Sequence, residues 1–419
     1  MIFDIIEQKS RGDYMVKKLW NKNFILLLQA SAVSTIGDLM YSVAIGYWVY
    51  EQTGSNSLMG IMSSISMFVT MFLSPFSGSV VDKLNRKWVI VLGDILQGVL
   101  MLTIGILAYA GKLSVSGVLI AAFLAALGGV FYAPAANTSL IDIIPRDEIV
   151  RGQSLFSGVS STINMVGTAF SGVMIAFFGV PLIIVLNGCS NIYSAISEMF
   201  ISIPKTVQEG EKVTVRGIFN DTKTAVKDIF SDSRLKLFVP CLLILNLLAS
   251  GPFTLILPFT IEKGFPVEQY GLLMSVWTLA SLVGVLLLGV IKFGPRARFW
   301  ILAIGFTLSE IFMIAAFLSK EFVTMCILAF IGALLNAVGN AIFNSSMMLA
   351  LPEKNRGAIM GFISSASVGG CAISAVLYGV LGDIFPLYII FAAGGAISLI
   401  PMLYMCFHPQ TKSFIIENT

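Results

Sequence analysis

Residues 57–111 read SLMGIMSSISMFVTMFLSPFSGSVVDKLNRKWVIVLGDILQGVLMLTIGILAYAG, two apolar stretches joined by a short basic turn. Each stretch exceeds the roughly 20 apolar residues that an α-helix needs to cross the hydrocarbon core of a bilayer. The whole chain continues this pattern, since 57% of its 419 residues are hydrophobic and only 12% are charged. We therefore expect an all-α polytopic membrane protein, embedded in a lipid bilayer, with no sizeable soluble domain.

Apolar stretches of this kind predict twelve transmembrane helices. They cover approximately residues 23–50, 57–81, 88–111, 115–140, 153–178, 181–203, 237–261, 268–291, 298–319, 322–350, 358–380 and 386–407. Of the 26 Lys and Arg residues, 23 lie in one alternating set of loops and termini, and only Lys112, Lys263 and Lys320 lie in the other set. Because basic loops remain in the cytoplasm, we expect both termini there. The net charge of +3 then reflects topology, and no nucleic-acid partner is expected.

The longest polar interval divides the chain into two halves of six spans each. We expect five regions: a cytoplasmic N-terminal segment, a first bundle, a central loop, a second bundle and a cytoplasmic tail, over residues 1–22, 23–203, 204–236, 237–407 and 408–419. Apolar residues at helical spacing over 215–230 predict an amphipathic helix in the central loop. Asn137 and Pro145 match Asn344 and Pro352 at one offset, and parallel repeats of this kind place a binding cavity between the halves.

A charged motif fills the turn between the second and third spans, with the pattern Gly78-x-x-x-Asp82-x-x-x-Arg86-Lys87. Gly78 permits close helix approach, Asp82 can face the positive end of a neighbouring helix, and Arg86 can bridge carboxylates. This motif resembles the signature loop of the major facilitator superfamily. The resemblance implies two pseudo-symmetric six-helix bundles and a latch that is closed in one conformation and broken in the other.

Two acids inside the spans are candidate partners in this gating loop. Asp142 lies at the inner end of the fourth span, and Asp94 lies one and a half turns into the third span. Asp94 and Glu198 are each roughly 9 Å from the inner edge at 1.5 Å per residue, so both could instead extend to the cytoplasmic interface. We therefore leave both interpretations of Asp94 open.

Within the superfamily, SAVSTIGDLMYSVAIGYWVYEQTGS (31–55) and IPRDEIVRGQSL (144–155) resemble the macrolide-efflux branch of drug exporters. That resemblance implies export of amphipathic compounds coupled to proton entry. The second half departs from the family pattern, because GVIKFGPRAR (289–298) contains no aspartate. The arginine motif of the fourth span is also missing, since residues 115–140 contain no Arg.

Asp38 and Glu310 are the most deeply placed charged residues of the chain. They lie roughly 22 Å and 18 Å from the inner edge of a core near 30 Å thick. Desolvation there disfavours the ionised carboxylate, so each could gain and lose a proton near neutral pH. Both are candidates for proton coupling. The alternatives are a purely structural carboxylate at Asp38 and a peripheral, permanently protonated Glu310.

Polar and aromatic residues of the spans are candidates for a substrate cavity. Asn336, Asn340 and Asn344 are spaced four residues apart and share one helix face. Hydrogen bonding between helices is an equally good explanation of such a polar stripe. The full set of cavity candidates is Tyr41, Trp48, Tyr132, Asn137, Asn246, Asn336, Asn340 and Asn344.

No G-x-x-x-x-G-K-[ST] nucleotide-binding motif occurs in the sequence, which points to an ion or solute gradient as the energy source. We expect a secondary active transporter, a proton-coupled exporter of amphipathic drugs, that is monomeric and lies in a bacterial cytoplasmic membrane. The alternatives are an exporter of a siderophore, peptide or lysolipid, or a non-transporting membrane receptor or scaffold. We expect neither an enzyme nor a bound cofactor or metal.

Overall fold

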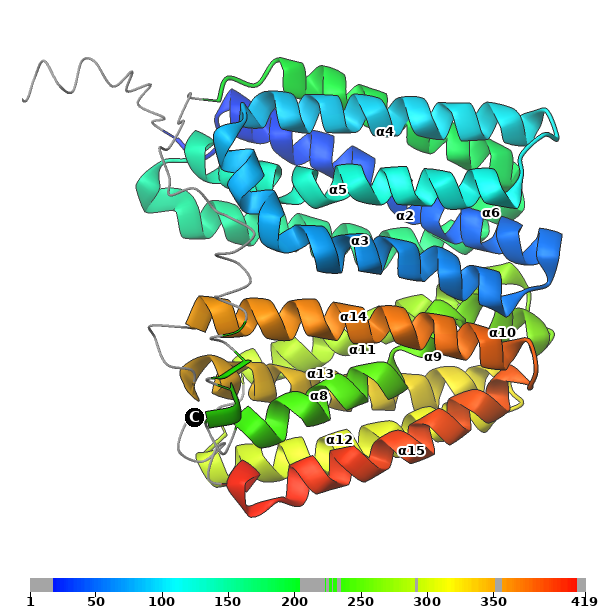
Figure 1. Cartoon of the computed structure of the whole chain (residues 1–419), viewed down its shortest axis with the longest axis vertical. Helices are drawn as coiled ribbons and strands as arrows, with labels where there is room; N and C mark the ends of the chain where they lie inside the picture. The colour runs from blue at the N-terminus through cyan, green and yellow to red at the C-terminus, as the bar shows by residue number, and fades with distance from the viewer. Residues whose placement is uncertain are drawn as a thin grey trace, which may run out of the picture. The chain divides into compact units, whose positions relative to one another are not determined.

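The computed structural model describes residues 18–203, 223, 226, 227, 229–231, 235–290, 293–350 and 356–412. Over these residues the chain is helical and contains no strand, which confirms the all-α prediction. Within each of the two units described below, the long helices run side by side (Figure 1). The elements are α2 (Lys22–Thr53), α3 (Asn56–Lys83), α4 (Arg86–Tyr109), α5 (Val115–Ile143), η1 (Arg146–Glu148), α6 (Ile149–Met199), α8 (Leu235–Ala249), α9 (Gly251–Thr254), α10 (Ile256–Glu262), α11 (Val267–Val290), α12 (Pro295–Leu318), α13 (Phe322–Ala350), α14 (Arg356–Gly382) and α15 (Leu387–Phe407).

Eleven helices of the described part are long and apolar enough to cross a membrane. The difference from twelve expected spans arises at α6, which is 51 residues long and carries two of them. Its backbone leaves the helical conformation at Gly179, with φ 71° and ψ 160°. Glycine adopts positive φ without a steric penalty, and Pro181 suits the first turn of the helix that follows. The expected break between 178 and 181 is therefore present as a kink.

The seventh expected span, 237–261, is interrupted in the structure. It is divided into α8, α9 and α10, with non-helical backbone at Leu255 (φ −112°, ψ 11°). Pro252 and Pro258 lie in this stretch. Proline has no backbone N–H to donate, and it disfavours the helical conformation in the residue before it. A polar residue, Ser250, lies between α8 and α9.

The chain folds into two compact units, each with its own apolar core. Unit 1 comprises Met1–Ser42, Phe76–Gly167 and Gly179–Lys212, and unit 2 comprises Val43–Pro75, Thr168–Phe178 and Val213–Thr419. Clusters that include Phe24 with Leu140 and Val81 with Ile90 form the core of unit 1.

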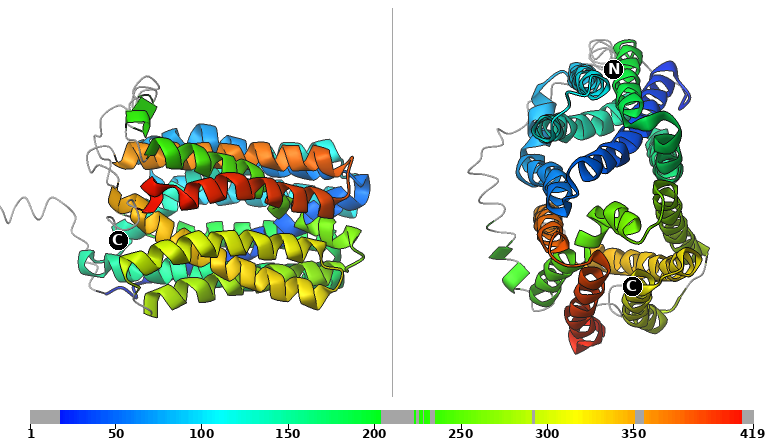
Figure 2. Two further views of the ribbon diagram at one scale, coloured as in Figure 1. Left: turned by 90° about the horizontal axis from the view of Figure 1, so that it is seen from below. Right: turned by 90° about the vertical axis from the view of Figure 1, so that its right-hand side faces the viewer.

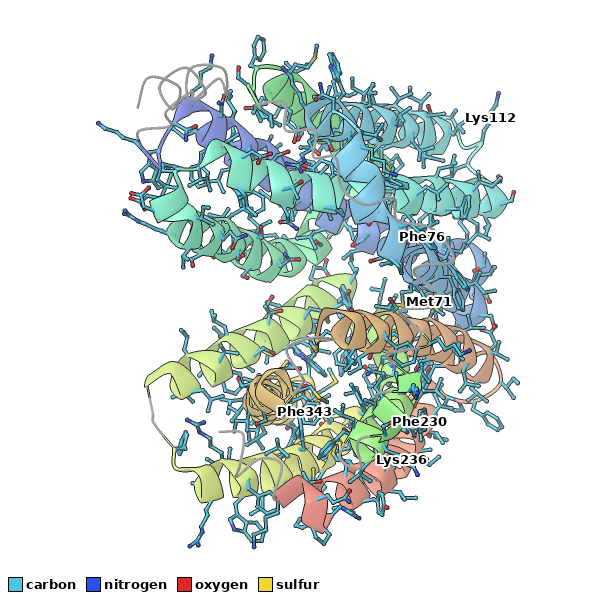
Figure 3. All side chains as sticks on the ribbon, turned by 60° about the vertical axis from the view of Figure 1, so that its left-hand side comes forward. Met71, Phe76, Lys112, Phe230, Lys236 and Phe343 are labelled. Atoms are coloured by element: carbon cyan, nitrogen blue, oxygen red, sulfur yellow. The ribbon has the colours of Figure 1, made fainter. Side chains whose placement is uncertain are left out.

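The core of unit 2 is a large cluster that includes Phe238, Phe299 and Phe343. In this unit α15 packs against α8 and α12 (Figure 2). Phe343 points among these helices, whereas Lys112 of unit 1 points away from its bundle at the turn after α4 (Figure 3). Ile229 joins the unit 2 cluster. The rest of the amphipathic helix expected over 215–230 lies largely outside the described residues.

Unit 2 includes parts of the first six spans, so its limits differ from the expected bundles 23–203 and 237–407. Glycines make this packing possible, as is common between membrane helices. A Cβ atom at Gly60 of α3 would overlap the carbonyl oxygen of Ala375 in α14. One at Gly379 would lie 2.8 Å from the carbonyl oxygen of Asn56. The two helix backbones are therefore in direct contact.

The N-terminus of α3 is held by a carboxylate that is distant in sequence. Asp383, in the turn before α15, accepts hydrogen bonds from the backbone N–H of Asn56 at 2.6 Å and the hydroxyl of Ser55 at 3.0 Å. The backbone N–H of Ser57 donates to the same carboxylate at 3.2 Å. Burial alone would raise the pKa of Asp383, but hydrogen bonds from Ser57, Asn56 and Ser55 outweigh it, so its pKa lies below 3.8.

Candidate functional site

Asp38 lies on α2 within unit 1 and is surrounded by amide side chains. Its Oδ1 accepts a hydrogen bond from Nε2 of Gln97 at 3.1 Å and one from Nδ2 of Asn191 at 3.4 Å. The same Nδ2 of Asn191 also donates to Oδ1 of Asn187 at 2.9 Å. The carboxylate is therefore held by neutral donors on α4 and α6.

Gly37 explains how α6 comes this close to Asp38. A Cβ atom at Gly37 would overlap the hydroxyl of Ser190 and lie 2.7 Å from Oδ1 of Asn187. A larger residue at position 37 would have to displace the side chains of Ser190 and Asn187 on α6. Gly37 thus leaves room for side chains of α6, and the next residue, Asp38, accepts a hydrogen bond from Asn191 of the same helix.

Two further carboxylates of unit 1 are buried. Asp94 on α4 is 4% exposed and Glu198 near the end of α6 is 1% exposed. Neighbouring helices cover both side chains at these depths. The hydroxyl of Tyr132 donates a hydrogen bond to Oε1 of Glu198 at 3.1 Å and lies 3.5 Å from Oγ of Ser31.

A cavity of about 350 Å³ opens beside these groups within unit 1. Most of the residues around it are polar, and Asp38, Asp94 and Tyr132 all line it. Its remaining polar lining residues are Ser31, Ser34, Thr35, Gln97, Asn137, Ser160 and Asn191. Asp38 is therefore in contact with open space that water or a solute can enter. We name this space the unit 1 cavity.

The signature loop forms an ion pair at one end of unit 1. Nη1 of Arg86 lies 2.5 Å from Oδ2 of Asp142, with the two side chains 10% and 19% exposed. Nζ of Lys87 donates to the carbonyl oxygen of Met199 at 2.7 Å. The loop therefore connects α4 to α5 and to the end of α6.

Three further residues were predicted to act in this loop. A Cβ atom at Gly78 would meet no atom of the described residues within 4 Å, so these residues show no close helix approach at Gly78. Asp94 lines the unit 1 cavity together with Asp38, and its role in the gating loop stays a prediction. The side chain of Asp82 lies outside the described residues.

Glu310 on α12 lies at the junction of two adjoining cavities of unit 2. Its Oε1 accepts a hydrogen bond from Oγ of Ser398 on α15 at 2.8 Å. The cavities measure about 200 Å³ and 90 Å³, and Glu310 and Asn336 line both. Aromatic residues and methionines supply much of the remaining surface: Phe253, Trp277, Phe306, Met313, Phe317, Phe343, Phe391, Met402 and Met405. We name these spaces the unit 2 cavities.

The predicted cavity residues fall into two groups. Tyr132 and Asn137 line the unit 1 cavity, and Asn246, Asn336 and Asn340 line the larger unit 2 cavity. None of these three cavities is lined by Tyr41, Trp48 or Asn344. Of the Asn336–Asn344 stripe, Nδ2 of Asn340 donates to Oδ1 of Asn336 at 2.7 Å, so part of its polarity is satisfied within α13.

Sequence reasoning missed several residues of these sites. Asn187 and Asn191 carried a usable signal, because they are four residues apart and share a face of α6, as the α13 asparagines do. Gln97 and Ser398 carried none, since a single polar residue in a span is common. Within the described ranges, no three His, Cys, Asp or Glu side chains are grouped to hold a metal ion.

Comparison with known proteins agrees with this architecture. The sequence matches the Major Facilitator Superfamily over residues 27–290 and 239–415. The multidrug efflux pump Tap of Mycobacterium tuberculosis is 23% identical over 375 residues, which cover 88% of this chain and 89% of that protein. Macrolide efflux protein A of Streptococcus pyogenes is 23% identical over 186 residues, so the match spans about half of each, 44% of this chain and 46% of that protein.

Among solved structures, the nucleoside transporter NupG is similar with a TM-score of 0.73, covering 92% of this chain and 99% of that one. At 12% sequence identity this likeness concerns the fold alone. The family points to a transporter rather than an enzyme, and the two efflux pumps support an efflux-like branch. This multi-pass membrane protein belongs to the Major Facilitator Superfamily.

Proposed function

We propose that this protein is a secondary active exporter that couples the efflux of amphipathic compounds to the entry of protons. One observation carries the proposal: a carboxylate lines a cavity in each unit, Asp38 in unit 1 and Glu310 in unit 2. Neither has a Lys or Arg within ion-pair distance among the described residues. Because an isolated charge in a membrane protein is costly, each carboxyl favours either a proton or a cationic ligand.

Amphipathic cargo is supported by the lining of the unit 2 cavities. The ring centroids of Phe253 and Trp277 lie 4.5 Å apart, edge to face, beside Glu310 and Asn336. Aromatic faces suit flat apolar groups, and a carboxylate suits an amine. The names of the two efflux pumps, which concern macrolides and multiple drugs, agree with such cargo.

Exchange follows if proton and substrate compete for a carboxylate. A protonated acid releases the substrate, and a deprotonated acid accepts it, so each cycle moves the two in opposite directions. We propose that the protein is a monomer that acts by alternating access in a bacterial cytoplasmic membrane. Both termini and the Arg86–Asp142 end of unit 1 would face the cytoplasm, because the basic loops lie on that side.

Transport in proteoliposomes tests the proposal, with ethidium and erythromycin as probes. We expect an imposed pH gradient to drive accumulation of at least one probe. The double variant Asp38→Asn, Glu310→Gln should abolish the gradient dependence, and the surface variant Asp147→Asn should retain it. Unchanged gradient dependence in the double variant would exclude these acids from coupling. Probe binding with no flux in either direction would favour a receptor or scaffold.

A further inference from the structure

Unit 1 contains more buried acid than a single proton site needs. Asp94 and Glu198 are 4% and 1% exposed, and Oδ2 of Asp94 and Oε2 of Glu198 have no hydrogen-bond partner among the described residues. No Lys or Arg of the described chain lies within ion-pair distance of either one. A buried polar atom without a partner is costly, and a proton or a water molecule is what would satisfy it.

The three acids of unit 1 lie near one another and form a series. Asp94 lies close enough to both Asp38 and Glu198 for their charges to interact. Asp38 and Asp94 line the unit 1 cavity, whose volume far exceeds the roughly 10–15 Å³ that one water molecule needs. Tyr132 lines the same cavity and donates to Glu198, so its hydroxyl joins the cavity to the third acid.

The end of this series lies next to the signature loop. Glu198 is adjacent to Met199, whose carbonyl oxygen accepts the hydrogen bond from Lys87. Lys87 and the Arg86–Asp142 pair mark the end that the basic-loop rule assigns to the cytoplasm. The series therefore extends from the middle of the bundle to its basic end.

We infer that Asp94 and Glu198, with Tyr132 beside them, form a proton path between Asp38 and the cytoplasmic end of unit 1. The inference rests on the proposed role of Asp38 in coupling. One O–H bond breaks at each donor and one forms at the next acceptor, so a proton that leaves Asp38 passes through cavity water to Asp94, then to Glu198, and finally to solvent. No other species is consumed.

Each neighbouring element contributes a group that faces the path. Near Asp94 lie Asp38 of α2, Tyr132 of α5, and Ser194 and Glu198 of α6. Asp94 and Glu198 each keep a buried oxygen without a partner among the described residues. Each can therefore accept a proton that leaves Asp38.

Two transport modes separate a proton path from a substrate site. The full-length protein in proteoliposomes is given ethidium, either with a pH gradient as the driving force or as an equal-pH exchange of labelled for unlabelled probe. Exchange needs no net proton movement. We expect Asp94→Asn and Glu198→Gln to lower gradient-driven accumulation at least tenfold and to keep exchange within twofold of the wild type. Asp94→Glu and Glu198→Asp, which retain a carboxyl, should recover at least half of the driven mode.

A matched control removes an acid outside the path. Glu148→Gln deletes the partner of Arg151, at 3.5 Å on the surface of unit 1, and should change neither mode. Equal loss of both modes in Asp94→Asn and Glu198→Gln, without rescue by the conservative variants, would overturn the inference in favour of a structural role. Full retention of driven accumulation would also overturn it. A wild type that ignores the pH gradient would instead refute the proposed function.

A measurement without substrate keeps the inference testable for any cargo. Infrared difference spectra after a pH jump report the C=O stretch of protonated carboxyl groups in the ligand-free protein. We expect Asp94→Asn and Glu198→Gln each to remove part of the pH-sensitive band. Spectra identical to the wild type in both variants would overturn the path. Loss of driven transport in the wild type when choline replaces Na⁺ at constant pH would instead refute the proposed function.

Discussion

The contact between Asp383 and the start of α3 gives a prediction whose size follows from the structure. Asp383→Asn removes the charge but keeps the shape of the side chain. A carboxylate at a helix N-terminus contributes about 0.3–1 kcal/mol, and hydrogen bonds to a charged group about 1.5–3 kcal/mol. Because Asp383 is exposed, solvent screening reduces the sum, and we expect a loss of about 1–2 kcal/mol. The equilibrium between states with and without this contact should then shift roughly 5- to 30-fold.

Spin-label distances measure this shift directly. Labels at Gln52→Cys and Ile384→Cys, in a background free of other cysteines, lie on either side of the contact within unit 2. We expect the short-distance population to fall in Asp383→Asn and to remain in the control Asp147→Asn. An unchanged distance distribution in Asp383→Asn would refute the claim that the Asp383 carboxylate stabilises this contact.

The same contact has a defined pH dependence. Because the pKa of Asp383 lies below 3.8 when the contact is formed, its stabilisation is fully present above about pH 4 and is lost as the pH falls through the lowered pKa. The short-distance population should therefore stay constant between pH 5 and 8. A change within that window that persists in Asp383→Asn would belong to another group.

Two further perturbations test the packing of the units. Asp142→Asn removes the carboxylate that lies 2.5 Å from Nη1 of Arg86, in a pair whose side chains are only 10% and 19% exposed, and should destabilise the fold by about 2–4 kcal/mol. The double variant Arg86→Gln, Asp142→Asn should cost less than the sum of the two single variants; thermal unfolding in detergent checks this, and additive effects would contradict it. Gly60→Ala should destabilise by about 1–3 kcal/mol because its methyl group meets the backbone of Ala375, whereas Gly128→Ala, with open space around it, should be neutral or slightly stabilising. Equal unfolding temperatures for the two glycine variants would show that α3 and α14 are not in backbone contact.

Much of the fold could be predicted from the sequence because lipid imposes simple rules on length and charge. The number of spans was predictable from runs of apolar residues, and Gly179 with Pro181 marks the boundary that the structure shows as a kink. The interruption at Leu255 was less predictable, since proline within a membrane helix is often tolerated. The assignment of residues 43–75 to unit 2 depends on packing against α14, more than 300 residues away, which no local pattern reports.

The candidate site was only partly predictable. Depth along a single helix identified Asp38 and Glu310 as acids inside the membrane core, and both line cavities. Depth alone did not predict the burial of Asp94 and Glu198, because exposure at a given depth depends on which helices pack over it. Gln97 and Asn191 were missed for the same reason, since their importance comes from a partner on another helix.

Side-specific labelling of position 38 tests the central claim that a carboxyl exchanges protons and solute in a water-filled cavity. Asp38→Cys, in a background without other cysteines, is exposed to a membrane-impermeant maleimide from either side of the membrane. We predict labelling that depends on the side of addition and is slowed by a transported probe. A position 38 that remains unreactive from both sides, with and without probe, would contradict the account.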